Sequence, residues 1–309
     1  MAIQTFNPDN VLLSEKQDGT FTPEMTSALM QDVAGNSLVM QLGTYEEMNG
    51  KQEKKFSIQT DGVSAYWVDE GQKIQTSKPE FAEVTLRAKK LGVIVLASRE
   101  YLTYTWSQFF NEIRPQIAQA FYDKIDQAAL LNEDNPFAFS VDESATTADN
   151  VVTGDLTFDN VLALEDAIFD ENGEVTAFVS SNRNHSLLRG ATNPDSPAES
   201  IYDRNSREID GITTVNYKDL PKGTVYAGDW ANIRYGTPYN ITFKISEDAQ
   251  ISTVTNADGS PVNLYEQELI ALRATMDFAF MTVKDEAFAK LEPGEGTPEE
   301  EPEEEVPAV

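Results

Sequence analysis

The chain has 309 residues, 40% of them hydrophobic, and is therefore long enough to bury one or two packed cores. It has no cysteine and one histidine, which excludes disulfides, thiolate nucleophiles, zinc fingers, iron–sulfur clusters and histidine-rich metal sites. Its formal net charge of −29 argues against binding to a nucleic-acid backbone, because such binding relies on Lys and Arg.

The N-terminal part of the chain predicts an extended arm followed by a helix. Thr22 is placed to cap the helix, Pro23 favours its first turn, and Gly35 is placed to end it. A short apolar stretch at residues 38–42 then predicts a strand.

Residues 54–98 predict a long β-hairpin. Phe56 and Ile58 alternate with polar neighbours, and residues 83–98 are rich in β-branched and apolar side chains. The connecting residues 61–81 are mostly polar and contain glycine and proline. Because an isolated hairpin is only marginally stable in water, we expect another chain to support it.

The same region differs in charge from the rest of the chain. Residues 51–99 carry nine basic and six acidic side chains, a net charge of +3, which leaves −32 elsewhere. One interpretation is an ordinary solvated strand pair. The other is a projection that docks on an acidic neighbouring copy.

Residues 105–131 predict the longest helix, about 40 Å at roughly 1.5 Å per residue. Its apolar side chains recur at four-residue intervals, at Phe109, Ile113, Ile117, Phe121 and Ile125. Pro115 is expected to kink this helix or to mark the start of its regular part.

The second half of the chain predicts a compact α+β arrangement. Helices are expected at residues 157–169 and 181–188, a loop at 141–150, and strands at 175–179, 212–215, 224–227, 241–245 and 250–254. Residues 264–283 close the folded chain, although the apolar pattern of 268–280 suits either a helix or a strand. Residues 292–309 contain eight Glu and no basic side chain, and we expect them to be disordered.

No motif predicts catalysis, cofactor binding or metal binding. His185 has no G-x-S-x-G nucleophile motif to accompany it, so we interpret it as structural. The acidic turns at residues 170–173 and 256–259 lack the upstream ligands of a calcium loop, and no phosphate-binding glycine motif occurs. A soluble hydrolase acting through carboxylates stays open as an alternative, and it predicts a monomer or small oligomer.

The order of these parts resembles that of the major capsid proteins of tailed bacteriophages. The resemblance is strongest to phages of Gram-positive bacteria, covers about residues 5–290, and depends on the order of its motifs. The stretches that carry it are AYWVDEGQKIQTSKPEF, LRAKKLGVIVLASREYL, SQFFNEIRPQIAQAFYDKIDQAAL, IYDRNSREIDGITTVN, GDWANIRYG, PVNLYEQELIALRATMDFAF and DEAFAKL.

The resemblance implies an α+β chain with the Hong Kong ninety-seven type capsid fold. It implies that the chain is divided into an N-terminal arm and helix (1–36), a P-domain strand (37–53), an E-loop hairpin (54–98), a P-domain spine helix (99–134), an A-domain (135–240), a P-domain return (241–291) and a disordered acidic tail (292–309).

The resemblance also implies a shell protein that is not an enzyme and needs no cofactor. Its copies would form pentamers and hexamers of an icosahedral shell around a double-stranded DNA genome that is not bound sequence-specifically. The contacts expected between copies lie in the E-loop, at Tyr66, Trp67, Glu70, Lys73 and Lys78. A shell of the encapsulin type, enclosing cargo enzymes, is an alternative with the same fold.

Further partners follow from the same resemblance. They are a portal protein, decoration proteins where a phage has them, and a scaffolding protein, expected to be separate because only about twenty residues precede the first helix. No run of eighteen apolar residues and no signal peptide is present, so we expect no membrane partner and assembly in the bacterial cytoplasm before the protein becomes part of the virion. A Lys–Asn crosslink between subunits is not expected.

Overall fold

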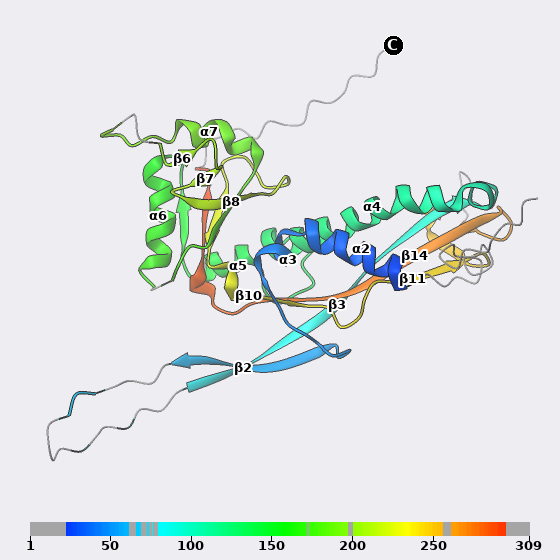
Figure 1. Ribbon diagram of the computed structural model, residues 1–309, viewed down its shortest axis with the longest axis horizontal. Coiled ribbons are helices and arrows are strands. Elements are labelled where there is room, and N and C mark those ends of the chain that lie inside the picture. Colours follow the sequence, from blue (N-terminus) through cyan, green and yellow to red (C-terminus); the bar gives the residue numbers. More distant parts are fainter. Residues whose placement is uncertain are drawn as a thin grey trace, which may run out of the picture. The chain divides into compact units, whose positions relative to one another are not determined.

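The computed structural model describes residues 23–61, 66–68, 73, 76, 80–171, 173–196, 200–255 and 261–294 (Figure 1). Helices and sheets occur together, as expected for an α+β fold. The chain packs into two units. Unit 1 comprises the described residues of Met1–Ala129, Asp134–Ala138 and Ile233–Val283, and unit 2 comprises those of Leu130–Glu133, Phe139–Asn232 and Lys284–Val309.

The described residues of unit 1 include the helices α2 (Pro23–Asn36), α3 (Leu38–Leu42) and all but the last two residues of α4 (Arg99–Leu131). The prediction of a strand at residues 38–42 is wrong, because these residues form α3. The Ser37 side chain caps this helix by accepting a hydrogen bond from the Met40 N–H, and Leu38, Val39 and Met40 are buried. A five-residue apolar run is compatible with either element, and here the cap favours the helix.

Helix α4 begins at Arg99, six residues before its predicted start, and ends at the predicted Leu131. Ile117, Phe121 and Ile125 of the predicted apolar stripe are buried. Pro115 lies inside the helix instead of at its start. Its missing N–H removes one helical hydrogen bond, which the 33 residues of the helix accommodate.

The main sheet of unit 1 is built on the long strand β14 (Leu269–Thr282), so the apolar run that suited either element is a strand. Its partners are β3 (Glu80–Ser98), β10 (Ile233–Gly236) and β11 (Thr242–Ser246), all antiparallel. Strand β1 (Thr44–Tyr45) pairs with β10, and β2 (Glu53–Asp61) pairs with β3. A separate hairpin joins β12 (Gln250–Thr255) to β13 (Pro261–Asn263).

Unit 2 is a seven-stranded sheet with helices α5 (Val141–Thr147), α6 (Phe158–Phe169) and α7 (His185–Gly190). In order across the sheet the strands are β4 (Val151–Thr153), β15 (Phe288–Glu292), β9 (Val225–Gly228), β5 (Ala177–Ser180), β8 (Ile212–Asn216), β7 (Glu208–Ile209) and β6 (Tyr202–Asp203). Short 3₁₀ turns lie at Asn182–Asn184, Trp230–Asn232 and Asp285–Ala287.

Residues 141–147 form helix α5, so the prediction of a loop at 141–150 is wrong there. Ser140 provides the N-cap by accepting a hydrogen bond from the Glu143 N–H, and Asp142 and Glu143 place acidic charge in the first turn. Both features stabilise a helix N-terminus, and the abundance of Ser, Thr and Asp in this stretch concealed them.

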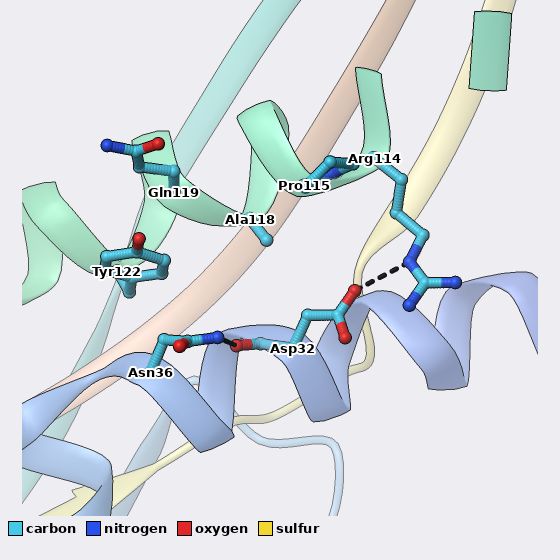
Figure 2. A pocket seen from close by; sticks show the side chains of 7 residues that line it. All are labelled: Asp32, Asn36, Arg114, Pro115, Ala118, Gln119 and Tyr122. Carbon is cyan, nitrogen blue, oxygen red and sulfur yellow. Dashed lines mark hydrogen bonds and ion pairs between the residues drawn. The ribbon is translucent and has the colours of Figure 1, made fainter. Parts of the chain in front are cut away.

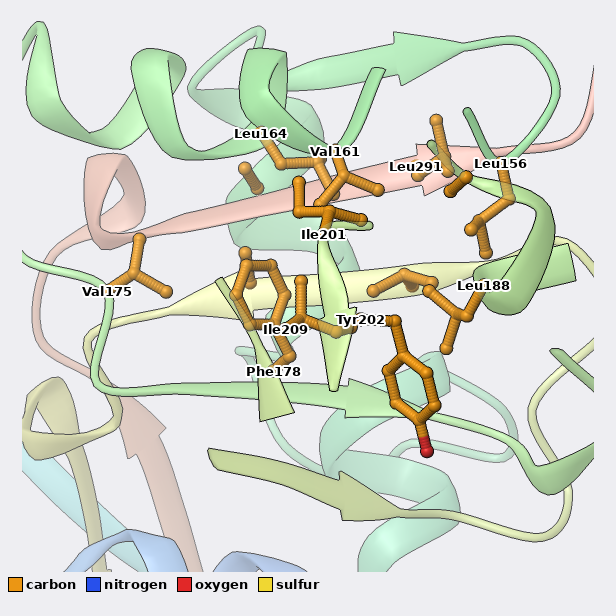
Figure 3. Packing of buried hydrophobic residues seen from close by; sticks show 14 of the residues in the cluster. Leu156, Val161, Leu164, Val175, Phe178, Leu188, Ile201, Tyr202, Ile209 and Leu291 are labelled. Carbon is orange, nitrogen blue, oxygen red and sulfur yellow. The ribbon is translucent and has the colours of Figure 1, made fainter. Parts of the chain in front are cut away.

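The core of unit 2 lies between α6 and the sheet. Figure 3 shows Val161 and Leu164 of α6 pointing toward Phe178 and Leu291, all of them in one buried cluster. Leu291 belongs to β15, which pairs with β9 on one side and β4 on the other. The final strand of the described chain is therefore part of the unit 2 core, whereas the resemblance implied that residues 241–291 return to the P-domain as one segment.

The predicted tail begins too early at residue 292. Glu292 is the last residue of β15, and its carbonyl accepts a hydrogen bond of 2.9 Å from the Gly154 N–H. Residues 295–309, to which the prediction of disorder otherwise applies, lie outside the described residues.

Candidate functional site

The hairpin of β2 and β3 is a two-stranded ribbon along residues 80–87 of β3. Strand β2 pairs with residues 80–87 of β3, whereas β14 pairs with residues 88–98. In the part of the chain that the structure describes, no third strand pairs with residues 80–87 (Figure 1). This part of the ribbon therefore gains no further stabilisation from strand pairing. Any further stabilisation must come from another surface that covers one of its two faces.

The register gives the ribbon one apolar and one polar face. Phe56 lies opposite Val84, and Ile58 lies opposite Ala82, so these four side chains share a face. Phe56, Ile58 and Val84 each stay partly exposed to solvent. An amphipathic ribbon of this kind gains free energy if another surface covers its apolar face.

Ion pairs cross the opposite face. Arg87 Nε lies 3.2 Å from Glu53 Oε1, and Lys55 Nζ lies 3.6 Å from Glu83 Oε2, with all four side chains more than half exposed. Exposed pairs of this kind contribute at most about 1 kcal/mol each, because water screens them. These ion pairs help to fix the strand register, but they stabilise the ribbon too little to replace a surface that covers its apolar face.

The structure describes three of the five residues predicted to contact a neighbouring copy. Tyr66 is 46% exposed, Trp67 is 104% exposed, and Lys73 is also exposed. Glu70 and Lys78 lie outside the described residues. A fully exposed indole ring is unusual on an isolated protein, whereas Trp and Tyr are enriched at protein interfaces.

Sequence reasoning did not single out two further exposed side chains of β3. Phe81 is 62% exposed at the far end of the ribbon, and Ile94 is 51% exposed where β3 pairs with β14. The signal that could have identified Phe81 is its position beside the polar 61–80 stretch, where an aromatic ring has no core to enter.

A groove of about 490 Å³ lies between α2 and α4 within unit 1 (Figure 2). Arg114 Nε donates a hydrogen bond of 2.6 Å to Asp32 Oδ2 across it, and this bond raises the pKa of Arg114. The remaining side chains of the groove are Asn36, Pro115, Ala118, Gln119 and Tyr122. The ion pair joins the two helices and offers no nucleophile or general base.

Among the described residues, two carboxyl groups have clearly raised pKa values, and they lie in separate units. Burial raises the pKa of Asp126 in unit 1 to about 6, and burial together with the charges of Asp210 and Asp166 raises that of Glu165 in unit 2 to about 7. Neither residue lines the groove of unit 1 or a smaller crevice beside α7 in unit 2. The pKa shift of each carboxyl group follows from burial and charge in its own surroundings.

His185, the predicted structural histidine, contacts Tyr202 of β6. Its Nε2 lies 2.7 Å from Tyr202 Oη, and the two rings meet edge to face with centroids 5.1 Å apart. Among the described residues, no group of three or more His, Asp or Glu is placed to hold a metal ion. The helices of the described chain include none with the length and apolar character needed to span a bilayer.

Comparisons with known proteins agree on one relationship. The model of the phage capsid family matches residues 18–292. The major capsid protein of Staphylococcus phage 80alpha is 50% identical over 295 residues, which cover 94% of this chain and 90% of that protein.

Solved structures agree on the fold. A chain from Microbacterium phage Oxtober96 superposes with a TM-score of 0.69 at 20% identity, covering 83% of this chain and 91% of that one. The capsid of an empty GTA particle, computed with C5 symmetry, gives a TM-score of 0.58 at 11% identity and covers 94% of this chain and 95% of that one.

Proposed function

This chain belongs to the phage capsid family, and we propose that its copies assemble into the pentamers and hexamers of an icosahedral shell that encloses double-stranded DNA. It is the major capsid protein of a tailed bacteriophage, a structural component of the virion and not an enzyme. The fold is that of phage capsid proteins.

The amphipathic ribbon of β2 and β3 is the observation that carries this proposal. Its apolar face is left partly exposed by the subunit itself, and the fully exposed Trp67 lies beyond it. We assign residues 54–98 to the E-loop, which reaches over a neighbouring subunit and buries that face. The contact residues would be Tyr66, Trp67, Glu70, Lys73 and Lys78.

The two units support the expected division of the chain into a P-domain and an A-domain. Unit 1, with α4 as the spine helix, corresponds to the P-domain, and unit 2 corresponds to the A-domain whose loops gather around the five- and six-fold axes. Strand β15 adds the end of the described chain to the A-domain core.

The partners proposed beyond the shell are a separate scaffolding protein, a portal protein and the packaged genome, with assembly in the host cytoplasm. The net charge of −29 supports contact with DNA that is repulsive and without sequence preference. A wall of this kind lets the genome slide during packaging.

Sedimentation of the full chain, produced together with its scaffolding protein, tests the proposed assembly. We expect closed particles of megadalton mass that electron microscopy shows as icosahedral shells. A monomer or small oligomer under these conditions would contradict the proposed assembly into pentamers and hexamers.

Substitutions on the two faces of the ribbon test the E-loop contact. Val84→Glu places a charge on the apolar face, and we expect it to leave the subunit folded but to lower particle yield at least about tenfold, or about 1.4 kcal/mol. Thr85→Glu is the matched control, because Thr85 is the next residue of β3, equally half-buried, and faces the polar side opposite Lys55. Equal particle yields from both variants would show that the apolar face is not covered on assembly.

A further inference from the structure

A small crevice lies at the edge of unit 2, between α7, the turn that joins β6 to β7, and the end of β8. It encloses a void of about 60 Å³, and Ser181, Asn182, His185, Arg207, Thr214 and Asn216 are among its lining residues. Such a volume holds a few water molecules or one carboxylate group. Figure 3 shows the hydroxyl of Tyr202, which also lines the crevice, pointing away from the buried cluster.

The lining of the crevice favours an anion. Arg207 and His185 lie in its wall, and none of its described lining residues is acidic. In a chain with 52 acidic and 23 basic residues, a pocket of this composition is unusual. The guanidinium of Arg207 has no ion-pair partner among the described residues, so its charge is available to a ligand.

One hydroxyl in the crevice also lacks a partner within the subunit. Thr214 Oγ1 is buried and makes no hydrogen bond to any described residue. Neighbouring polar groups are already used: the Asn182 N–H donates to Asn216 Oδ1 at 2.8 Å, and the Arg183 N–H donates to Ser181 Oγ at 3.3 Å. A buried hydroxyl without a partner costs about 1–3 kcal/mol in mutational series, so an acceptor that enters the crevice would be stabilised.

The backbone at Arg207 adds an independent observation. Arg207 has φ +59°, in the left-handed region that favours glycine, and its N–H donates to the Asp203 carbonyl at 3.0 Å to close the turn. A residue with a Cβ is strained in this conformation. A long cationic side chain is nevertheless held there at the mouth of a polar crevice, an arrangement typical of functional sites.

We propose that this crevice receives the side-chain carboxylate of an Asp or Glu from a second copy of the chain in the assembled shell. Rings of identical subunits use heterologous contacts, in which each copy presents one patch to the preceding copy and a different, complementary patch to the next. A cationic crevice on a strongly acidic chain finds its complement on any acidic surface of the adjoining copy. The inference rests on the proposed function, because it requires copies to meet.

Two substitutions of Arg207 test this contact, and the first of them adds no backbone strain at residue 207. Arg207→Gly removes the guanidinium and also relieves the positive φ, so backbone strain cannot explain a defect. Arg207→Glu reverses the charge at the same position. We expect normal thermal unfolding of the Gly variant but at least a tenfold loss of particle yield, and a larger loss for the Glu variant.

Arg204→Glu is the matched control for Arg207→Glu. Arg204 is exposed in the same turn and does not line the crevice, so the same charge reversal should change particle yield less than twofold. All variants are produced as full chains with the scaffolding protein, beside the unsubstituted chain, and particles are counted by sedimentation and electron microscopy.

The outcomes separate the two proposals. If the unsubstituted chain forms no particles, the proposed function fails. If it forms particles and Arg207→Gly forms them equally well, or if Arg204→Glu is as defective as Arg207→Glu, the shell function stands and the crevice contact is refuted. Rescue of Arg207→Glu by an Asp→Lys or Glu→Lys substitution elsewhere in the chain would identify the partner carboxylate.

Discussion

At the scale of single residues, Asp126 links two helices that lie far apart in sequence. It is 2% exposed on α4 and accepts hydrogen bonds from the Ser37 hydroxyl (2.7 Å), the Leu38 N–H (2.8 Å) and the Val39 N–H (3.2 Å) at the start of α3. These donors favour the carboxylate, but burial outweighs them and raises its pKa from 3.8 to about 6. The folded subunit therefore binds a proton that the unfolded chain releases.

The pH dependence of stability follows from this shift. Because the pKa of Asp126 is higher in the folded state, its contribution is fully present below pH 3.8 and is lost as the pH rises through about 6. Relative to Asp126→Asn, the free energy of unfolding of the natural chain should fall by roughly 3 kcal/mol between pH 3.5 and 7. Urea unfolding of both proteins across this range measures the difference.

Asp248→Asn is the control for the loss of one charge, because Asp248 is an exposed carboxylate of the same unit. Its effect on the free energy of unfolding shows what removal of one exposed charge from this unit does by itself. Parallel pH profiles for the natural chain and Asp126→Asn would mean that Asp126 titrates as it does in the unfolded chain.

At the scale of elements, a buried lysine connects one helix and two strands of unit 2. Lys290 of β15, with a side chain 7% exposed, lies 3.0 Å from Asp142 Oδ1 of α5 and 2.6 Å from Glu292 Oε1. The Tyr226 hydroxyl of β9 donates to the same Asp142 oxygen at 2.8 Å. Burial lowers the pKa of Lys290, but its hydrogen bonds and the two carboxylate charges outweigh that effect and leave the pKa raised.

Replacing the lysine should loosen α5 from the sheet. We expect Lys290→Met to lower the free energy of unfolding by about 2 kcal/mol, less than for a fully buried pair because both carboxylates are partly exposed. Lys284→Met removes an exposed lysine of the same unit and should change stability by less than about 0.5 kcal/mol. Thermal unfolding measures both, and equal effects would exclude a specific role for the Lys290 ion pairs.

At the scale of the whole molecule, the chain is a strongly acidic subunit that ends in a glutamate-rich segment. β15, the last strand of the described residues, holds Glu292 through the Gly154 N–H and through Lys290, so the packed core extends to residue 292. Deletion from residue 292 and deletion from residue 295 should therefore have different effects, which the sequence alone does not predict.

We expect deletion of residues 295–309 to leave both the unfolding temperature and particle yield unchanged, because these residues follow the last strand of the sheet. Deletion of residues 292–309 removes a sheet hydrogen bond and an ion pair, and should cost about 1–3 kcal/mol. Thermal unfolding and sedimentation of the two variants provide the comparison. Loss of particles in the shorter deletion would assign the acidic segment a role in assembly.

The local pattern of apolar and polar residues was sufficient to predict several helices and strands. The period of two in residues 54–59 predicted the β2–β3 hairpin, and apolar spacing predicted the buried stripe of α4 and the helix α6. The absence of cysteine and of catalytic motifs directed the interpretation toward a structural protein, and the resemblance to capsid proteins was confirmed by the family to which the chain belongs.

Tertiary structure decided the elements whose partners lie far away in sequence. Leu38–Leu42 is a helix whose first N–H groups are satisfied by Asp126, nearly ninety residues later. Leu269–Thr282 is a strand because β3 provides its ladder, and Phe288–Glu292 joins unit 2 because β9 and β4 flank it. The sequence by itself determined where apolar side chains recur, but a short or uniformly apolar run takes its conformation from the backbone groups that fold against it, and those are fixed only by the packed chain.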